Sequence, residues 1–421
     1  MLQQPNLFAV FQNEIVAKML DILFVAAPIW LPILLFAIFW RLWTVYTFIW
    51  AEHKQGHTLL EIRLPREVSR TPLAMEIILS TLHITSGEST FIERYWLGKR
   101  RPWFSLEIAS IRGELHFFIW TRTFFKPIVE NAVYAQYPEV EIYEVEDYAS
   151  ELRYDPETIS AWGIEFMFTK PDPYPIKTYV DYALDKRGEK EEFKSDPITA
   201  LLEYCGSCEQ SGQIWIQILI QSHRRDKPQV GTLFGKTTWK QEAEALADKI
   251  LRRDPKTKIP ITRIKVGEFA FPGSPILTDA EKHVAESILR SVDKLAFNVG
   301  IRGIYIDKTE SFKPVYILGL IGCLKQFNTV ELNGFAPALR WGYGFTYPWE
   351  FEKLRLPRHM RRLIRYYRER AYFHSPYRQR PLVMTTEELA TLYHFPGGVA
   401  MTPTLGRVMS RKAEPPGNLP T

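Results

Sequence analysis

The sequence predicts an α+β protein attached to a membrane by one N-terminal helix, and three observations support this fold class. An apolar run covers Ile22–Trp50 and contains one charge, Arg41. After it, short segments that alternate between apolar and polar residues, a pattern typical of strands, are interspersed with segments of helical periodicity. Hydrophobic residues make up 46% of the 421 residues, a proportion typical of chains with packed cores.

The apolar run is long enough to form a transmembrane helix over residues 22–50. A helix needs about 20 apolar residues to cross the hydrocarbon core, and Ile22–Trp40 alone comes close to that length. Pro28 and Pro32 each remove a hydrogen-bond donor and favour a kink. Residues 1–21 form an amphipathic lead-in, which either extends the span, lies flat in the interface or is a frayed helical end. Aromatic residues, which prefer the headgroup level, gather at the far end of the run: Trp40, Trp43, Tyr46 and Trp50.

The distribution of charge predicts the orientation of this helix. Lys18 is the one basic residue before Ile22–Trp40, whereas several follow this stretch: Arg41, Lys54, Arg63, Arg66 and Arg70. The positive-inside rule then places the body in the cytoplasm and the short N-terminus outside, as expected for a single-pass protein of the inner membrane. A cleaved signal peptide would begin with a basic segment, which the first residues lack. A buried core helix would normally show a polar face.

Residues 58–148 are predicted to form a first domain of alternating strands and helices. The expected strands are Leu59–Leu64, Phe104–Ile111, Glu114–Trp120 and Glu139–Glu146. Helices are expected after Thr71, with Met75, Ile78, Leu79 and Leu82 on one face, and from Pro127 to Gln136. Residues Ser86–Pro102 are expected to be a polar, basic loop. The order β-α-β-β-α-β predicts a ferredoxin-like sandwich, in which two helices cover one antiparallel sheet.

Residues 160–335 are predicted to repeat this pattern with insertions, as a second and larger α+β domain. The expected strands are Gly163–Thr169, Gln213–Gln221 and Asn298–Ile306, and the expected helices are Pro197–Cys205, Trp239–Arg253 and Asp279–Ala296. Asp185–Ser195 is a charged insertion. The expected architecture is therefore a membrane helix followed by two ferredoxin-like domains.

Residues 340–421 differ in composition and contain the main candidate binding site. Trp341–Trp349 is rich in glycine and aromatic residues, and Lys412–Thr421 is a proline-rich, extended tail. Between them, Arg358–Arg370 interleaves arginines with two tyrosines. Arginine neutralises phosphates and tyrosine stacks on bases, while the same charges also suit anionic lipid headgroups. A solvated helix whose Leu363, Ile364 and Tyr367 pack on the body is the structural alternative. The candidate phosphate-binding residues are Arg358, Arg361, Arg362, Arg365 and Arg368.

No catalytic, cofactor or metal site is predicted. Cys205 and Cys208 form a C-x-x-C pair, but a zinc site needs further ligands at similar spacing, so two buried or semi-exposed thiols are expected. Cys323 is the third cysteine. The stretch Gly231–Thr237 has three residues between its glycines where a phosphate loop has four, which favours a surface loop. The net charge of +5 is mild and argues against a nucleic-acid-binding function of the whole surface.

Several passages resemble a known family. They are Glu61–Glu67, Thr71–Glu76, Ala132–Ile142, Lys325–Phe335, Thr385–Pro396 (T-T-E-E-L-A-T-L-Y-H-F-P) and Lys412–Pro420 (K-A-E-P-P-G-N-L-P). In this order they resemble the membrane-anchored, non-motor region of bacterial type IV secretion and conjugation ATPases of the HerA/FtsK-like superfamily. In longer relatives the P-P-x-N-L-P passage is followed by the P-loop motor, whereas this sequence ends there.

The resemblance implies an anchor and scaffold without its motor, and no catalytic residues are carried over. Its implied partner is a separate P-loop ATPase, or further copies within a secretion complex, and its implied substrate is DNA or protein moved across a membrane. The residues expected to contact the motor are Glu387, Glu388, His394, Pro415 and Pro416. The sequence thus predicts a non-enzymatic inner-membrane scaffold. The first alternative is a membrane-tethered nucleic-acid-binding protein that uses residues 355–380, and a hydrolase without a recognisable motif is the third hypothesis.

Overall fold

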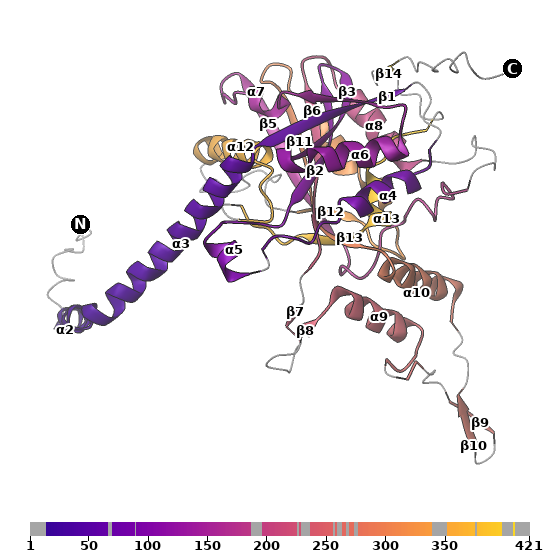
Figure 1. Cartoon of the computed structure of the whole chain (residues 1–421), viewed down its shortest axis with the longest axis horizontal. Helices are drawn as coiled ribbons and strands as arrows, with labels where there is room; N and C mark the ends of the chain where they lie inside the picture. The colour runs from indigo at the N-terminus through magenta and orange to yellow at the C-terminus, as the bar shows by residue number, and fades with distance from the viewer. Residues whose placement is uncertain are drawn as a thin grey trace, which may run out of the picture. The chain divides into compact units, whose positions relative to one another are not determined.

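The structure is a computed structural model that divides into two units (Figure 1). The first unit is Met1–Lys54 with Gly87–Arg100, and the second is Gln55–Ser86 with Arg101–Thr421. The residues it describes are 14–65, 70–88, 90–186, 196–224, 227–228, 236–255, 257–258, 263–266, 269–272, 277–338, 352–374, 377–397 and 407–408.

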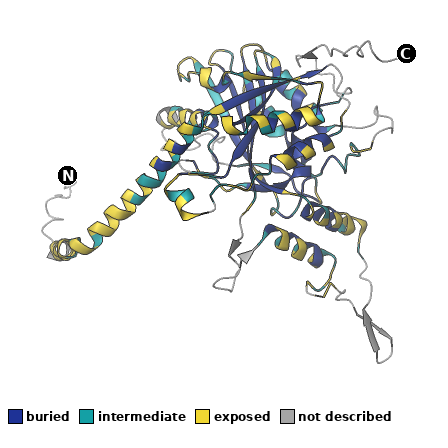
Figure 2. Ribbon diagram, viewed as in Figure 1, coloured by how far each residue is buried: buried dark blue, intermediate teal, exposed yellow. Residues whose placement is uncertain are grey.

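The first unit contains the predicted apolar helix. Its helices are α2 (Glu14–Val25), α3 (Ala27–Gln55) and α5 (Phe91–Tyr95). Among the described residues α3 is the one helix long and apolar enough to cross a membrane, and its apolar stretch is exposed along its length (Figure 2). The observed helix differs in one respect from the predicted helix over residues 22–50: it is interrupted at Ala26. Pro28 has no N–H to donate to the carbonyl of Phe24, which accounts for a break at this point.

The second unit is built on one sheet of ten strands. Its strands are β1 (His57–Pro65), β2 (Trp103–Ile111), β3 (Glu114–Arg122), β4 (Glu141–Val145), β5 (Ile159–Phe168), β6 (Gln213–Ser222), β11 (Ala296–Lys308), β12 (Phe335–Ala338), β13 (Leu382–Thr385) and β14 (Arg407–Val408). The order is β12-β5-β11-β6-β2-β3-β1-β14, with β4 paired to β1 and β13 to β11. All of these pairs are antiparallel except β1–β14. The predicted α+β class is therefore confirmed.

The strands of both predicted domains lie in this one sheet. The ranges 58–148 and 160–335 are joined where β2 pairs with β6, from Trp103 opposite Gln221 to Ser110 opposite Ile214. Two further two-stranded sheets are β7 (Lys227–Pro228) with β8 (Lys236–Thr237), and β9 (Arg263–Val266) with β10 (Phe269–Pro272). The predicted boundaries between the domains stay a prediction.

Helices pack an apolar core against one face of the sheet. They are α4 (Leu73–Thr81), α6 (Lys126–Gln136), α8 (Pro197–Gly206), α11 (Val315–Gly322) and α13 (Thr386–Leu392). The predicted stripe of α4 is confirmed, since Met75, Ile78, Leu79 and Leu82 are all buried. The side chains of β2 and β6 that point to these helices are apolar, such as Leu106, Ile108 and Ile218. Because side chains alternate along a strand, the intervening residues point to the opposite face.

On that opposite face lie α12 (Glu352–Arg368), α7 (Tyr148–Glu151) and a row of buried polar side chains. The strand register aligns Glu107 with Gln217, and Gln217 with Arg302. Arg302 is in turn opposite Glu165 on β5. We call Glu107, Gln217, Arg302 and Glu165 the polar row. It crosses four neighbouring strands at the same height, so its charges must be satisfied by whatever covers this face.

A helical insertion separates β6 from β11. Its helices α9 (Trp239–Ile250) and α10 (Asp279–Val292) share a small apolar core formed mainly by Ala243, Ala247, Val284 and Ile288. The helix predicted to reach Ala296 ends at Val292, because β11 begins at Ala296 and takes up that residue. The side chain of Thr278, and not of Asp279, caps α10, in a capping box with Glu281.

Two sequence predictions concern loops and tails. The expected loop Ser86–Pro102 contains a short helix, α5, whose N-cap Thr90 forms a capping box with Glu93. This T-x-x-E pattern is the helix-start signal that the basic composition of the segment obscured. The aromatic segment Trp341–Trp349, the glycines at 231 and 235 and the tail Lys412–Thr421 lie outside the described residues.

Candidate functional site

The arginine-rich segment forms the amphipathic helix α12. Its buried face consists of Met360, Leu363, Ile364 and Tyr367. The structural alternative is thus confirmed for Leu363, Ile364 and Tyr367, which pack on the body. The opposite face is basic, because the period of the helix places the arginines away from this stripe.

The five candidate arginines divide into two groups. Arg358, Arg361, Arg362 and Arg365 are exposed. Arg365 forms an ion pair with Glu369 one turn along the helix, at 2.8 Å. Arg368 is partly buried and donates from Nε to the carbonyl of Ala149 and from Nη2 to that of Leu152, which ties α12 to the end of α7. Four of the five therefore present a basic surface, and Arg368 has a structural role.

Arg370, just beyond α12, connects this segment to the polar row. Its side chain is fully buried, and Nε and Nη2 donate to Oε1 and Oε2 of Glu107 at 3.0 and 3.1 Å. Nη2 also donates to Asp147 at 3.0 Å, and Nη1 contacts the same carboxylate. Burial alone would lower the pKa of Arg370, but Glu107 and Asp147 hold the pKa above its ordinary value. The geometry is the bidentate arrangement that makes arginine–carboxylate pairs strong.

The rest of the polar row is also satisfied. Glu107 accepts hydrogen bonds from Tyr148, Gln217 and Ser105, at 2.8, 2.7 and 2.6 Å. Arg302 donates to Gln217 at 2.6 Å and to the carbonyls of Tyr366 and Ala371 at 2.9 and 3.2 Å. The polar row therefore holds the C-terminal end of α12 through backbone carbonyls as well as through Arg370. Tyr377 donates to Glu165 at 2.6 Å.

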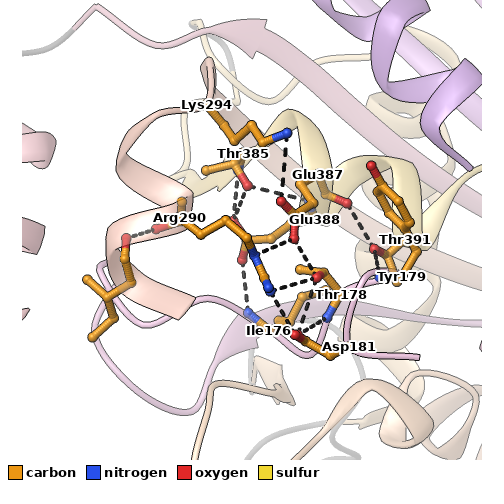
Figure 3. A network of polar contacts seen from close by, with 12 residues as sticks. Ile176, Thr178, Tyr179, Asp181, Arg290, Lys294, Thr385, Glu387, Glu388 and Thr391 are labelled. Atoms are coloured by element: carbon orange, nitrogen blue, oxygen red, sulfur yellow. Dashed lines mark hydrogen bonds and ion pairs between the residues drawn. The ribbon is translucent and has the colours of Figure 1, made fainter. Parts of the chain in front are cut away.

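Three of the five residues predicted to contact a motor are buried in this structure. Glu387, Glu388 and His394 are exposed by 3%, 2% and 1%. They lie on and after α13, and Figure 3 shows Glu387 and Glu388 within a network that joins α13 to α10 and residues 176–181. The residues packed around these three side chains belong to the same chain. Pro415 and Pro416 lie outside the described residues, so docking by the tail stays a prediction.

Glu387 is bound by side chains from two other segments. Arg290 of α10 lies 3.1 Å from its Oε1, and Lys294 lies 3.8 Å from Oε2. The hydroxyl of Thr178 donates to Oε1 at 2.5 Å. Lys294 also pairs with Glu76 of α4 at 2.7 Å. These contacts connect α4, α10 and α13 through charges rather than through apolar packing.

Glu388 is the carboxylate of a capping box at the start of α13. Its Oε2 accepts from the backbone N–H and the hydroxyl of Thr385, at 2.8 and 2.9 Å, and its Oε1 accepts from the N–H of Ile176 at 3.0 Å. Burial raises the pKa of Glu388 to about 7, while these hydrogen bonds offset part of the rise. Glu388 therefore links the helix start to a distant loop.

His394 and the cysteines are the remaining candidate contact or metal-binding residues from the sequence. His394 Nε2 lies 3.0 Å from Asp196, the N-cap of α8. Burial alone would raise the pKa of Asp196, but His394 holds it below its ordinary value. Cys205 and Cys208 are buried, as expected, and burial raises the pKa of Cys208 to about 12. In the described part of the chain no three His, Cys, Asp or Glu side chains are grouped as metal ligands.

Sequence reasoning missed the polar row and Arg370. Glu107 and Gln217 stand at the centres of apolar strands, where a polar residue usually marks a solvent face. The alternation of residues in these strands contains a signal, because a solvated face would show polar residues at every second position. In Gln213–Gln221 the outward positions include Trp215 and Leu219, which indicates a covered face.

In the part of the chain that the structure describes, the fold and contacts define an α+β protein with one helix of membrane-spanning length and a sheet covered on both faces. The chain belongs to the family described as "Domain of unknown function (DUF8128)", whose family model matches residues 48–406. No curated protein and no solved structure matches the chain.

Replacement of Arg370 is expected to destabilise the second unit strongly. In R370M the side chain keeps its length but leaves Glu107 buried without its counter-charge, which costs about 3–5 kcal/mol for a broken buried pair. Urea unfolding of the purified full-length protein in detergent, followed by the near-ultraviolet signal of its tryptophans, measures this loss.

The matched control is R365A, which breaks the exposed pair with Glu369. Its cost should be about 0.5 kcal/mol or less, as for exposed pairs of this spacing. Equal losses for R370M and R365A would contradict a central role for the Arg370–Glu107 pair.

The free energy of unfolding is expected to depend on pH through Glu388. Its folded pKa of about 7 lies above the ordinary unfolded value. Between pH of about 4.5 and 7 the folded state therefore holds a proton that the unfolded state has lost, so stability falls as pH rises through this window. E388Q removes the titration, and its stability should change less between pH 5 and 7 than that of the wild type. Identical slopes in a pH series of urea unfolding would contradict the raised pKa.

Proposed function

We propose that this chain is a single-span inner-membrane protein with a cytoplasmic body, and that it is a non-enzymatic scaffold for a P-loop ATPase of a type IV secretion or DNA-transfer system. The type of partner comes from the resemblance of its passages to the non-motor region of such ATPases. The structural observation that supports a scaffold is the connection between the candidate span and the sheet.

That connection is one residue long. α3 ends at Gln55 and β1 begins at His57, so that Gly56 alone separates the two. β1 is also hydrogen-bonded to β3 and β4, so it is an internal strand and not a loose edge. The chain therefore passes from the candidate span into a strand of the sheet without a linker segment, as we expect of a scaffold attached to a membrane.

The strand order supports two ferredoxin-like halves within the sheet. The first half has the order β4-β1-β3-β2, and the second has β12-β5-β11-β6. In both, the first strand lies between the third and the fourth, as expected for β-α-β-β-α-β units. We propose that the two units are joined edge to edge through β2 and β6. An experimental structure with another strand order would contradict this architecture.

The two most specific passages of the resemblance differ in what they contribute to the proposed scaffold. Thr385–Pro396 supplies β13, α13 and the buried contacts of Glu387 and Glu388, so its pattern is accounted for by the interior of the body. This leaves the tail Lys412–Thr421, with Pro415 and Pro416, as the proposed contact with the ATPase.

Affinity purification tests this partner. The tagged full-length protein, extracted from membranes of its own host, should enrich a P-loop ATPase about tenfold over an untagged control, as detected by mass spectrometry. Deletion of residues 412–421 should remove that enrichment, while R361A/R362A/R365A, which leaves the tail intact, should retain it. If no P-loop ATPase is enriched and the deletion changes no partner, the scaffold function is wrong.

The proposed orientation follows from the basic residues after the span, such as Arg63 and Arg70. Trypsin should digest the body in inside-out vesicles and leave it intact in right-side-out vesicles, with immunoblotting of a C-terminal tag as the measurement. Digestion in right-side-out vesicles would place the body outside.

A membrane-tethered nucleic-acid-binding protein is the second candidate, because Arg358, Arg361, Arg362 and Arg365 share the exposed face of α12. Such a face can contact phosphates without reading bases. Tyr367 does not contribute a stacking surface, since it is buried against Trp215 with ring centroids 5.3 Å apart. Any binding should therefore be electrostatic and independent of sequence.

DNA binding by the full-length protein in detergent, measured by fluorescence anisotropy across a salt series, tests this function. R361A/R362A/R365A should reduce the slope of log K against log salt by about 3, since each phosphate contact contributes about 0.9. K240A/K249A/R253A removes the same charge from exposed positions on and after α9 and should leave the slope unchanged. Negligible binding at low salt, or equal effects of both variants, would exclude this function.

A further inference from the structure

The segment Gly87–Arg100, in the first unit, has an apolar surface whose exposure to water is unfavourable. It contains α5 and carries four exposed apolar side chains within seven residues: Phe91, Ile92, Trp96 and Leu97, exposed by 61%, 63%, 58% and 44%. Contiguous apolar surface of this kind marks an interaction site in a folded protein.

The segment packs along α3 through aromatic rings. Trp40 stacks on Phe91 with ring centroids 5.9 Å apart, and Trp43 lies 5.5 Å from Trp96. The indole N–H of Trp43 donates to the carbonyl of Tyr95 at 3.0 Å. The apolar side chains that remain exposed on α5 are therefore continuous with the side of a helix that has the length and composition of a membrane span.

The contact continues one turn further along α3. Gly98 has φ of +61°, and a Cβ at this position would overlap the carbonyl oxygen of Thr47. Arg100 lies over the ring of Phe48, 5.3 Å from its centroid. Only glycine allows so close an approach, so the backbone of the segment is fitted to the helix and does not merely touch it.

The position of this contact along α3 indicates where it would lie relative to the hydrocarbon core of a bilayer. Trp40 and Thr47 lie 13 and 20 residues after Ala27, or about 20 and 30 Å along the helix. The hydrocarbon core is about 30 Å thick, so a core that begins near Ala27 ends beside α5. Trp and Tyr are the side chains favoured at that boundary.

We propose that Gly87–Arg100 is a second membrane-contacting element, whose Phe91, Ile92, Trp96 and Leu97 insert among the acyl chains at the headgroup boundary of the bilayer that α3 crosses. The proposal rests on the membrane anchoring proposed above. The occupant of this surface is a phospholipid bilayer, because the exposed residues are continuous with the exposed apolar side chains of α3, such as Leu42 at 64% and Tyr46 at 63%. The basic residues sit beside the apolar ones, with Arg94 and Lys99 exposed by 43% and 50%, at the level where phosphate groups would lie.

Depth-dependent fluorescence quenching tests this element in the full-length protein. The three native cysteines are buried, so an NBD-maleimide label attaches mainly to an introduced thiol. I92C reports on α5, L42C on α3, and E286C on the exposed side of α10. Each is reconstituted into phosphatidylcholine–phosphatidylglycerol vesicles, with and without lipids brominated near the top of the acyl chain.

Bromination should reduce the fluorescence of the I92C and L42C labels at least twofold and leave that of E286C unchanged. Quenching of L42C without quenching of I92C would overturn the second element while leaving the anchor in place. A blue-shifted but unquenched I92C label would assign the surface to a second copy or another protein, and would also overturn the proposal. If L42C is not quenched either, the anchor itself fails.

Discussion

The buried ion pair between Arg370 and Glu107 is the interaction on which the second layer of the body depends. The polar row crosses the centre of the sheet, and a bare face of this kind would leave charges to be solvated or paired. α12 and the residues that follow it cover the face, and they bring the counter-charge with them. Because removal of either charge leaves the other buried and unpaired, the packing of this segment on the sheet is sensitive to the loss of either partner.

This constraint explains why the arginine-rich segment is both a structural and a surface element. Arg368 and Arg370 point inward to carbonyls and carboxylates, whereas Arg358, Arg361 and Arg362 remain exposed. An arginine run is usually assigned to a ligand as a whole. Here the helical period divides it, so only the outer residues are candidates for nucleic acid or lipid.

The sequence was informative where a local pattern decides the structure. The alternation in Gln213–Gln221 and the helical stripe of α4 depend on neighbours within a few residues, and both elements are present. The pairing of β2 with β6 and the burial of Glu107 depend on contacts between residues more than 100 positions apart, which no local pattern encodes. The family resemblance assigns Glu388 to a partner, whereas the T-x-x-E spacing from Thr385 indicates a capping box, which the structure contains.

The chain passes between the two units three times, at Lys54–Gln55, Ser86–Gly87 and Arg100–Arg101. The first unit is therefore discontinuous in the sequence, because β1 and α4, which belong to the other unit, lie between α3 and Gly87–Arg100. During synthesis α3 emerges from the ribosome before the segment that packs on it has been made. The first unit can be completed only after the start of the second unit has been synthesised.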